Sequence, residues 1–127
     1  MIKREKYIAP IRGFYKSDLI KIITGVRRSG KSVVLVQIME EIRESSDNII
    51  FLNFEDRIVT ESIVTWKDIV KYVDEHRQDG RCYVFLDEVQ EIADWQYACK
   101  TLRLHDCSVF ITGSNSKLLS REFTKEL

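Results

Sequence analysis

The sequence predicts an α/β fold, a three-layer α-β-α sandwich in which a mostly parallel sheet lies between two layers of helices. Three observations support this prediction. Four short apolar runs alternate along the chain with segments in which apolar residues recur at helical spacing. The runs are continuous, as expected for parallel strands that helices bury on both faces. The length of 127 residues fits one domain with one hydrophobic core.

Strands and helices alternate after a lead-in arm, which is residues 1–18. The strand predictions rest on runs of β-branched and aromatic residues, and the helix predictions rest on apolar residues three and four positions apart. The predicted strands are residues 19–23, 49–52, 82–86 and 109–112, and the predicted helices are residues 33–42, 66–73, 95–102 and 117–123.

Two of the predicted helices have recognisable starting residues. Thr65 is followed three residues later by Asp68, which is the pattern of a capping box. Asp94 is the expected N-cap of the helix that follows it. The segment between the second strand and Thr65 is less regular, and residues 55–64 are predicted to form a loop.

The composition excludes some classes of protein and leaves others open. Lys and Arg together number 20, as do Asp and Glu, so no overall charge points to nucleic acid, although a local basic patch is not excluded. The three cysteines share no C-x-x-C spacing, which favours reduced thiols in a cytoplasmic protein. The first residues are too polar for a signal peptide, and no apolar stretch is long enough to span a bilayer.

The stretch after the first predicted strand carries the clearest chemical signal. Residues 25–32 read G-V-R-R-S-G-K-S and match the pattern G-x-x-x-x-G-K-[ST] at every fixed position. The two glycines allow backbone angles that a Cβ would forbid, so the backbone N–H groups can turn inward around a phosphate chain. The following helix adds its first N–H groups and the positive end of its dipole. The alternative is a glycine-rich turn before an ordinary helix.

This pattern assigns roles to individual residues of a nucleotide site. Lys31 is expected to reach the β- and γ-phosphates, and Ser32 is expected to bind Mg²⁺. The two neighbouring arginines either reach phosphates or lie on the surface of the loop. The predicted phosphate-binding residues are Gly25, Val26, Arg27, Arg28, Ser29, Gly30, Lys31, Ser32 and Val33.

A second motif ends the third predicted strand. Asp87 and Glu88 follow an apolar run, at the end of the strand where parallel sheets bind their ligands. Asp87 is expected to hold Mg²⁺, directly or through water. Glu88 is expected to point to the other side and to orient or deprotonate an attacking water. An acidic strand-to-helix turn is the alternative, and the phosphate-binding pattern earlier in the chain favours the catalytic interpretation.

Two more predicted strands end in polar residues. The fourth strand leads into T-G-S-N, in which Ser114 or Asn115 is expected to hydrogen-bond the γ-phosphate or the attacking water. The alternative is a helix N-cap at Ser114 or Ser116, and the two roles are compatible. Asn53 ends the second strand, and its amide can hold Glu88 inactive until a partner engages, or it can simply be a turn residue.

Taken in order, these motifs resemble a known family over about residues 2–122. The stretches ITGVRRSGKS, NFED, VFLDEVQ followed by Trp95, and ITGSNSKLLS are similar to the AAA-type ATPase domain of archaeal and bacterial proteins. In those proteins the domain is joined to a C-terminal domain of poorly understood function. The resemblance implies a P-loop NTPase core of AAA/RecA type that binds ATP and Mg²⁺. It implies catalytic roles for Glu88, Lys31, Asn115 and Ser114, and metal binding by Ser32 and Asp87.

The resemblance also implies what this chain lacks. Such domains continue into a fifth strand, a helical lid and arginines that contact the γ-phosphate, and none of these follows Leu127. Residues 1–127 are therefore expected to be an ATPase core that is truncated at its C-terminus and weak or inactive by itself. Without a fifth strand the first strand lies at the sheet edge, and an unpaired apolar edge invites self-association.

Three functions remain open from the sequence. The first is Mg²⁺-dependent ATP hydrolysis coupled to a partner or to the missing C-terminal domain. The second is a nucleotide-binding interaction module that does not hydrolyse, and the third is a small-molecule kinase, for which Glu88 would be unnecessary. ATP is expected over GTP because the N-K-x-D signature of guanine recognition is missing, since residues 124–127 read T-K-E-L.

Overall fold

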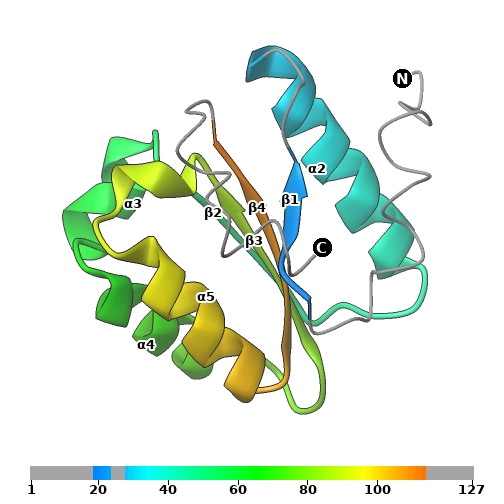
Figure 1. The fold of residues 1–127 in the computed structure, drawn as a ribbon. Coiled ribbons are helices and arrows are strands. Elements are labelled where there is room, and N and C mark those ends of the chain that lie inside the picture. The colour runs from blue at the N-terminus through cyan, green and yellow to red at the C-terminus, as the bar shows by residue number, and fades with distance from the viewer. Residues whose placement is uncertain (1–18, 24–27, 114–127) are drawn as a thin grey trace.

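The computed structural model describes residues 19–23 and 28–113, without the side chains of residues 28–32. Four strands form one sheet in the order β1-β4-β3-β2, and each adjacent pair is parallel. The parallel sheet that the apolar runs predict is therefore confirmed (Figure 1). The strands are β1 (Lys21–Ile23), β2 (Ile49–Asn53), β3 (Cys82–Asp87) and β4 (Cys107–Thr112).

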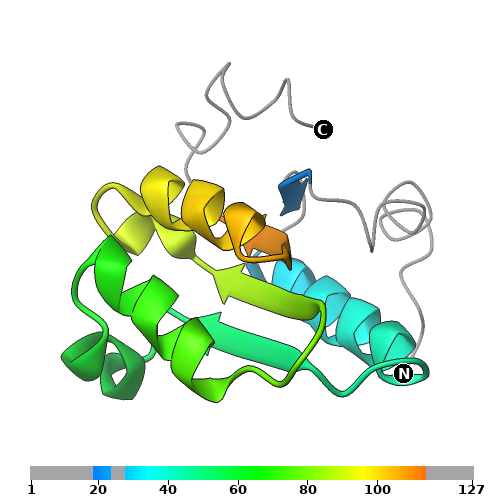
Figure 2. The same ribbon diagram turned by 90° about the horizontal axis from the view of Figure 1, so that it is seen from below.

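Helices cover both faces of this sheet. One face carries α2, and the other carries α3, α4 and α5 (Figures 1 and 2). The three-layer α-β-α sandwich is thus confirmed. The helices are α2 (Arg28–Arg43), α3 (Arg57–Ser62), α4 (Trp66–His76) and α5 (Trp95–Leu104), and a short 3₁₀ turn, η1 (Val89–Glu91), precedes α5.

Successive residues of the strands supply two separate hydrophobic clusters. Because neighbouring side chains of a strand point to opposite faces, every second residue packs beneath the same layer of helices. The aromatic rings of Phe85 and Phe110 stack beneath α2, with their centroids 4.5 Å apart. The cluster beneath α4 and α5 includes Val84, Leu86, Val109 and Ile111, and the cluster beneath α2 includes Ile23, Tyr83, Phe85 and Phe110.

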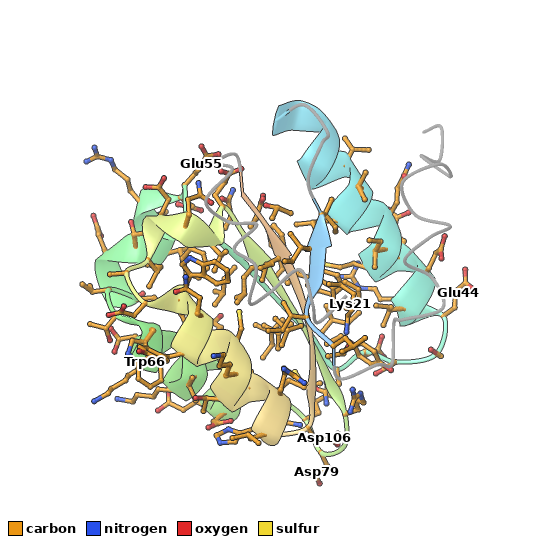
Figure 3. The ribbon with its side chains drawn as sticks, viewed as in Figure 1. Lys21, Glu44, Glu55, Trp66, Asp79 and Asp106 are labelled. Atoms are coloured by element: carbon orange, nitrogen blue, oxygen red, sulfur yellow. The ribbon has the colours of Figure 1, made fainter. Side chains whose placement is uncertain are left out.

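The first strand contains a buried lysine within its apolar run. Lys21 is 2% exposed and lies on the α2 face of the sheet (Figure 3). Its Nζ donates a hydrogen bond to Ser108 Oγ at 2.7 Å and lies 4.7 Å from the centroid of the Phe110 ring. A buried ammonium group needs such partners, because losing water without replacement is costly.

The capping box predicted at the start of α4 is confirmed. The Oγ1 of Thr65 accepts the backbone N–H of Asp68, and Asp68 Oδ2 accepts the N–H groups of Thr65 and Val64 at 3.0 Å each. These backbone donors stabilise the carboxylate and lower the pKa of Asp68 below its usual value. The side chains of Ile69 and Val73 then bury the inner face of the helix.

The loop predicted for residues 55–64 is wrong, because α3 occupies part of it. Asp56 is the N-cap of this helix, and its Oδ1 accepts the N–H of Ile58 at 2.9 Å. No residue of α3 is fully buried, so the helix has no continuous apolar stripe that a sequence pattern could reveal. A local cap, rather than packing, determines where this helix begins.

Two other predicted features differ from the structure. Asp94 stands at the N-cap position of α5 but makes no capping hydrogen bond with its side chain, because its backbone is left-handed, with φ 59° and ψ 29°. The helix expected from Val33 begins at Arg28, since arginine and lysine are good helix formers and a helix that has started extends at little cost. The other predicted strands and helices within the described residues are confirmed to within two residues at their starts.

Several expectations concern residues that the structure does not describe. The lead-in arm of residues 1–18 and the helix of residues 117–123 belong to this group. Among the helices found within residues 28–113, none combines the length and the apolar character that crossing a membrane requires.

Candidate functional site

Three neighbouring strands end in polar residues on the same face of the sheet. Asn53 and Asp87 are register partners at the ends of β2 and β3, and Thr112 ends β4 on the other side of β3. Alternation places Asp87 on the same face as Phe85, and Thr112 on the same face as Phe110. That face is the one that α2 covers. The carboxyl ends of the strands therefore gather polar groups beside the start of α2 (Figure 1).

Thr112 joins the two predicted acidic residues. Its Oγ1 donates a hydrogen bond to Asp87 Oδ1 and accepts the backbone N–H of Glu88 at 3.0 Å. Both acidic residues are 3% exposed. One hydroxyl thus fixes the carboxylate of Asp87 relative to the backbone that carries Glu88. Thr112 was not among the residues predicted for the site, although its place as the last residue of an apolar run was a signal that it faces this edge.

Glu88 has an unusual backbone conformation for its residue type. Its φ is 54° and its ψ is 48°, which is the left-handed region. The other described non-glycine residues with positive φ are Asp94 and Asp106, and short polar side chains such as aspartate tolerate this region better than glutamate does. Such a conformation costs on the order of 1–3 kcal/mol and persists where the surrounding structure holds it. It ends the alternation of β3 and starts η1, so the expectation that Glu88 simply points to the opposite face does not apply.

An amide group holds the side chain of Glu88. The Nε2 of Gln90, in η1, donates to Glu88 Oε1 at 2.9 Å. Asn53, the amide that the sequence suggested for this role, has its Oδ1 bonded to the N–H of Glu55 at 3.0 Å, as a turn residue does. Gln90 was not foreseen, because its contact depends on the left-handed turn at Glu88, which no sequence pattern indicates.

The strand that precedes the phosphate-binding pattern and the helix that contains its last residues lie next to these polar groups. β1 ends at Ile23, whose register partner is Thr112, and α2 begins at Arg28 at the same edge (Figure 1). The backbone of Lys31 and Ser32 is in the first turns of α2, and their side chains are outside the described part. Gly25, Val26 and Arg27 are also outside it, as are Ser114 and Asn115.

The chemistry of this edge fits a phosphate chain with Mg²⁺. Carboxylate and hydroxyl oxygens are the ligands that Mg²⁺ prefers, and it typically takes one or two from protein and the rest from phosphates and water. Within the described residues no group of three or more His, Cys, Asp or Glu side chains forms a complete metal cage. Asp87 beside a helix start suits the incomplete type of site, in which the substrate supplies the remaining ligands.

A cleft lies beside this edge, between α3 and η1. Its volume is about 600 Å³. Glu55, which follows β2, lies at this edge of the molecule (Figure 3). The cleft is lined by Phe54, Glu55, Arg57, Thr60, Glu61, Ile63, Val64, Glu91 and Ile92. Since η1 supplies part of the lining and also carries Gln90, the cleft and Glu88 share one structural element.

Comparisons with known proteins cover almost the whole chain. Residues 17–127 match a protein-family model described as AAA domain. The chain is 37% identical over 128 residues to an uncharacterized protein of Haemophilus influenzae, and 35% identical over 109 residues to the uncharacterized protein MJ1544 of Methanocaldococcus jannaschii. These alignments cover 96% and 85% of this chain, but only 32% and 24% of the relatives. The chain thus spans about a third or less of these relatives.

Proposed function

Because the chain belongs to the family of AAA domains, we propose that it binds ATP with Mg²⁺ and hydrolyses the ATP at the carboxyl edge of its sheet. The observation that carries this proposal is the hydrogen-bonded group of Thr112, Asp87 and Glu88. It holds a potential metal ligand and a potential base together, next to the strand that leads into the phosphate-binding pattern.

Each residue has a separate task in the proposed reaction. Residues 25–33 surround the phosphates, with Lys31 paired to the β- and γ-phosphates and with Ser32 and Asp87 as ligands of Mg²⁺. When bound, Mg²⁺ neutralises part of the charge on the phosphates. Glu88 accepts the proton of the attacking water, because a carboxylate within hydrogen-bond reach is a competent general base. Ser114 and Asn115, which follow Gly113, hydrogen-bond the γ-phosphate or that water.

Turnover is proposed to depend on a partner. In related P-loop enzymes an arginine that contacts the γ-phosphate raises the rate by about 10³–10⁵. Arg121 is the only arginine after β4 in the sequence. We therefore expect slow hydrolysis by these 127 residues alone and faster hydrolysis when a protein partner, a second copy or a further domain supplies such a group.

Nucleotide binding is the first part of the proposal to test. Titration of each variant with a fluorescent ATP analogue and Mg²⁺ measures the affinity. Lys31→Ala is expected to weaken binding about 10–100-fold, because it removes a charge-assisted bond to phosphate. Lys67→Ala makes the same change in charge on the exposed surface of α4 and is expected to leave the affinity unchanged. Equal affinity in the two variants would contradict the loop assignment, and competition by GTP as strong as that by ATP would contradict the base preference.

Hydrolysis separates the proposed ATPase from the two other functions. Glu88→Gln is expected to keep ATP affinity and to lower phosphate release about 10²–10⁴-fold, because an amide has the shape of the carboxylate without its basicity. Lys31→Ala serves as the control for contaminating ATPases. Tight binding with no Lys31-dependent release, with or without added partners, would favour the non-hydrolysing module. Phosphoryl transfer to an acceptor that survives Glu88→Gln would favour the kinase.

A further inference from the structure

The amide of Gln90 has a defined orientation. Its Nε2 donates to Glu88 Oε1 at 2.9 Å, and Glu88 is buried. The reversed orientation would place the amide oxygen against the carboxylate, and two acceptors cannot share a hydrogen bond. The chemistry of the contact therefore fixes which atom faces Glu88, and it directs Oε1 of Gln90 away from that carboxylate oxygen.

The Oε1 atom of Gln90 lacks a donor. It is buried and has no hydrogen-bond partner within the part of the chain that the structure describes. Arg81 Nε is also buried and has no partner among the described residues, but it is a donor and lies just before the start of β3, away from Glu88. Nη1 of the same guanidinium donates to Asp106 Oδ1 at 2.6 Å. Native proteins rarely leave a buried amide oxygen unsatisfied, and such an atom calls for an explanation.

A water molecule would supply the donor that Gln90 Oε1 lacks. The two polar atoms of one amide are about 2 Å apart, so a water bonded to Oε1 is within reach of the carboxylate that Nε2 holds. Water has two O–H donors, and a water at this position would have two acceptors, Gln90 Oε1 and the Glu88 carboxylate. A nucleophilic water needs this arrangement, because one acceptor removes a proton and the other fixes the direction of the remaining O–H.

We propose that Gln90 is a positioning residue that, together with Glu88, binds the water that attacks the γ-phosphate. This inference rests on the proposed ATPase function and assigns one more residue to it. The water oxygen forms a bond to the γ-phosphorus, its proton passes to Glu88, and the bond to the β–γ bridging oxygen breaks. ADP leaves with the electron pair of that bond, and Gln90 transfers no proton.

A transition-state analogue tests this proposal without measuring turnover. Aluminium fluoride beside ADP and Mg²⁺ mimics the phosphoryl group with its attacking water, so a positioned water site increases its affinity. We expect aluminium fluoride to tighten binding of a fluorescent ADP about 10²-fold or more in the wild-type chain. Gln90→Met keeps the volume and removes both polar atoms, so it is expected to lose about tenfold or more of that gain. Its affinity for ADP alone is expected to stay within about twofold of wild type.

Two further variants keep the test decisive. Gln96→Met makes the same substitution in the first turn of α5 and is expected to retain the full gain. Gln90→Asn keeps an amide but is one methylene shorter, so it folds with a polar group in place and loses most of the gain. A wild-type gain that Gln90→Met and Gln90→Asn both retain would limit Gln90 to shaping η1 and would overturn the proposal. ADP binding without any gain in wild type would overturn it as well, whereas failure of wild type to bind ADP or ATP would refute the proposed function itself.

Discussion

The two edges of the sheet use buried polar groups in different ways. The amino edge is the edge at which β2, β3 and β4 begin, near Asp79 and Asp106 in Figure 3. There the side chain of Asn48 bonds only to main-chain atoms. Its Nδ2 donates to the carbonyl oxygens of Gln78 at 3.0 Å and Arg81 at 2.9 Å, and its Oδ1 accepts the N–H of Gln78 at 2.8 Å. This one side chain closes the turn that leads into β3.

At the carboxyl edge some buried polar side chains also bond to one another. Thr112 binds Asp87, Gln90 binds Glu88, and the oxygen of Gln90 remains without a partner among the described residues. Side chains that satisfy main-chain groups stabilise a turn whether or not a ligand is bound. Side chains that are arranged around one another, with one acceptor unused, are suited to receive a ligand. Mutations at the amino edge should therefore lower the stability of the fold, whereas mutations at the carboxyl edge should mainly change nucleotide binding or hydrolysis.

The largest expected effect is a loss of stability at the amino edge. Asn48→Ala removes four side-chain hydrogen bonds, to the carbonyl oxygens of Gln78, Gly80 and Arg81 and from the N–H of Gln78, so we expect it to lower the free energy of unfolding by about 2–3 kcal/mol. Asn53→Ala at the carboxyl edge removes one turn bond and is expected to cost less than about 1 kcal/mol. Urea denaturation measures both. If the two asparagines cost the same, the contrast between the edges is wrong.

The second prediction concerns Thr112, whose hydroxyl links Asp87 to the backbone of Glu88 at the carboxyl edge. Thr112→Val keeps the shape of the side chain and removes the hydroxyl that joins Asp87 to the backbone of Glu88. We expect phosphate release to fall about tenfold, because each lost bond to a charged group is worth about 1.5–3 kcal/mol. ATP affinity should change less than the rate. Thr101→Val, the same change within α5, is the control, and equal rates in the two variants would show that the hydroxyl has no role in catalysis.

The sequence predicted the fold and the acidic pair better than it predicted the contacts around them. Continuous apolar runs identified the four strands of the described sheet, and strand ends placed Asp87 and Glu88 at its carboxyl edge. Thr112 and Gln90 were missed, because their roles depend on register across β3 and β4 and on the left-handed backbone of Glu88, which are properties of the folded chain. The assignments of residues 25–33, Ser114 and Asn115 to nucleotide binding stay predictions, since they depend on side chains outside the described part.

The third prediction concerns the thiol of Cys107 at the amino edge. Cys82 and Cys107 are register partners at the starts of β3 and β4. The thiol of Cys82 donates to Cys107, and Arg77 Nη1 lies 3.4 Å from Cys107 Sγ, so the pKa of Cys107 is lowered while that of Cys82 is raised. Burial alone raises the pKa of Cys99. All three thiols are fully buried, so their labelling is slow. The partners that favour the Cys107 thiolate should still make it the first of the three that iodoacetamide labels at neutral pH, as peptide mass spectrometry would show.

Removal of the Arg77 guanidinium provides the matched control for the labelling of Cys107. Arg77→Met keeps the length of the side chain and takes away the charge beside Cys107, so labelling of Cys107 should slow relative to Cys99. Uniform labelling of the three cysteines in wild type, or no change in Arg77→Met, would show that the amino edge does not polarise this thiol. ATP affinity is expected to be the same in Arg77→Met and wild type, because this edge holds no part of the proposed nucleotide site.

The smallest expected effect concerns Asp68, a carboxylate that bonds to main-chain N–H groups as Asn48 does. Its pKa is lowered by these bonds, so its contribution to stability is present above its unfolded pKa of about 3.9 and is lost as pH falls through the lower folded pKa. Asp68→Ala should destabilise the protein modestly at pH 7, and the difference from wild type should shrink near pH 3. Thr65→Ala removes the partner cap, which costs about 1 kcal/mol at both pH values. The opposite result would be a difference between Asp68→Ala and wild type that does not depend on pH, together with a fall in ATP affinity. That result would show that the Asp68 carboxylate binds a ligand and does not cap the main chain of α4.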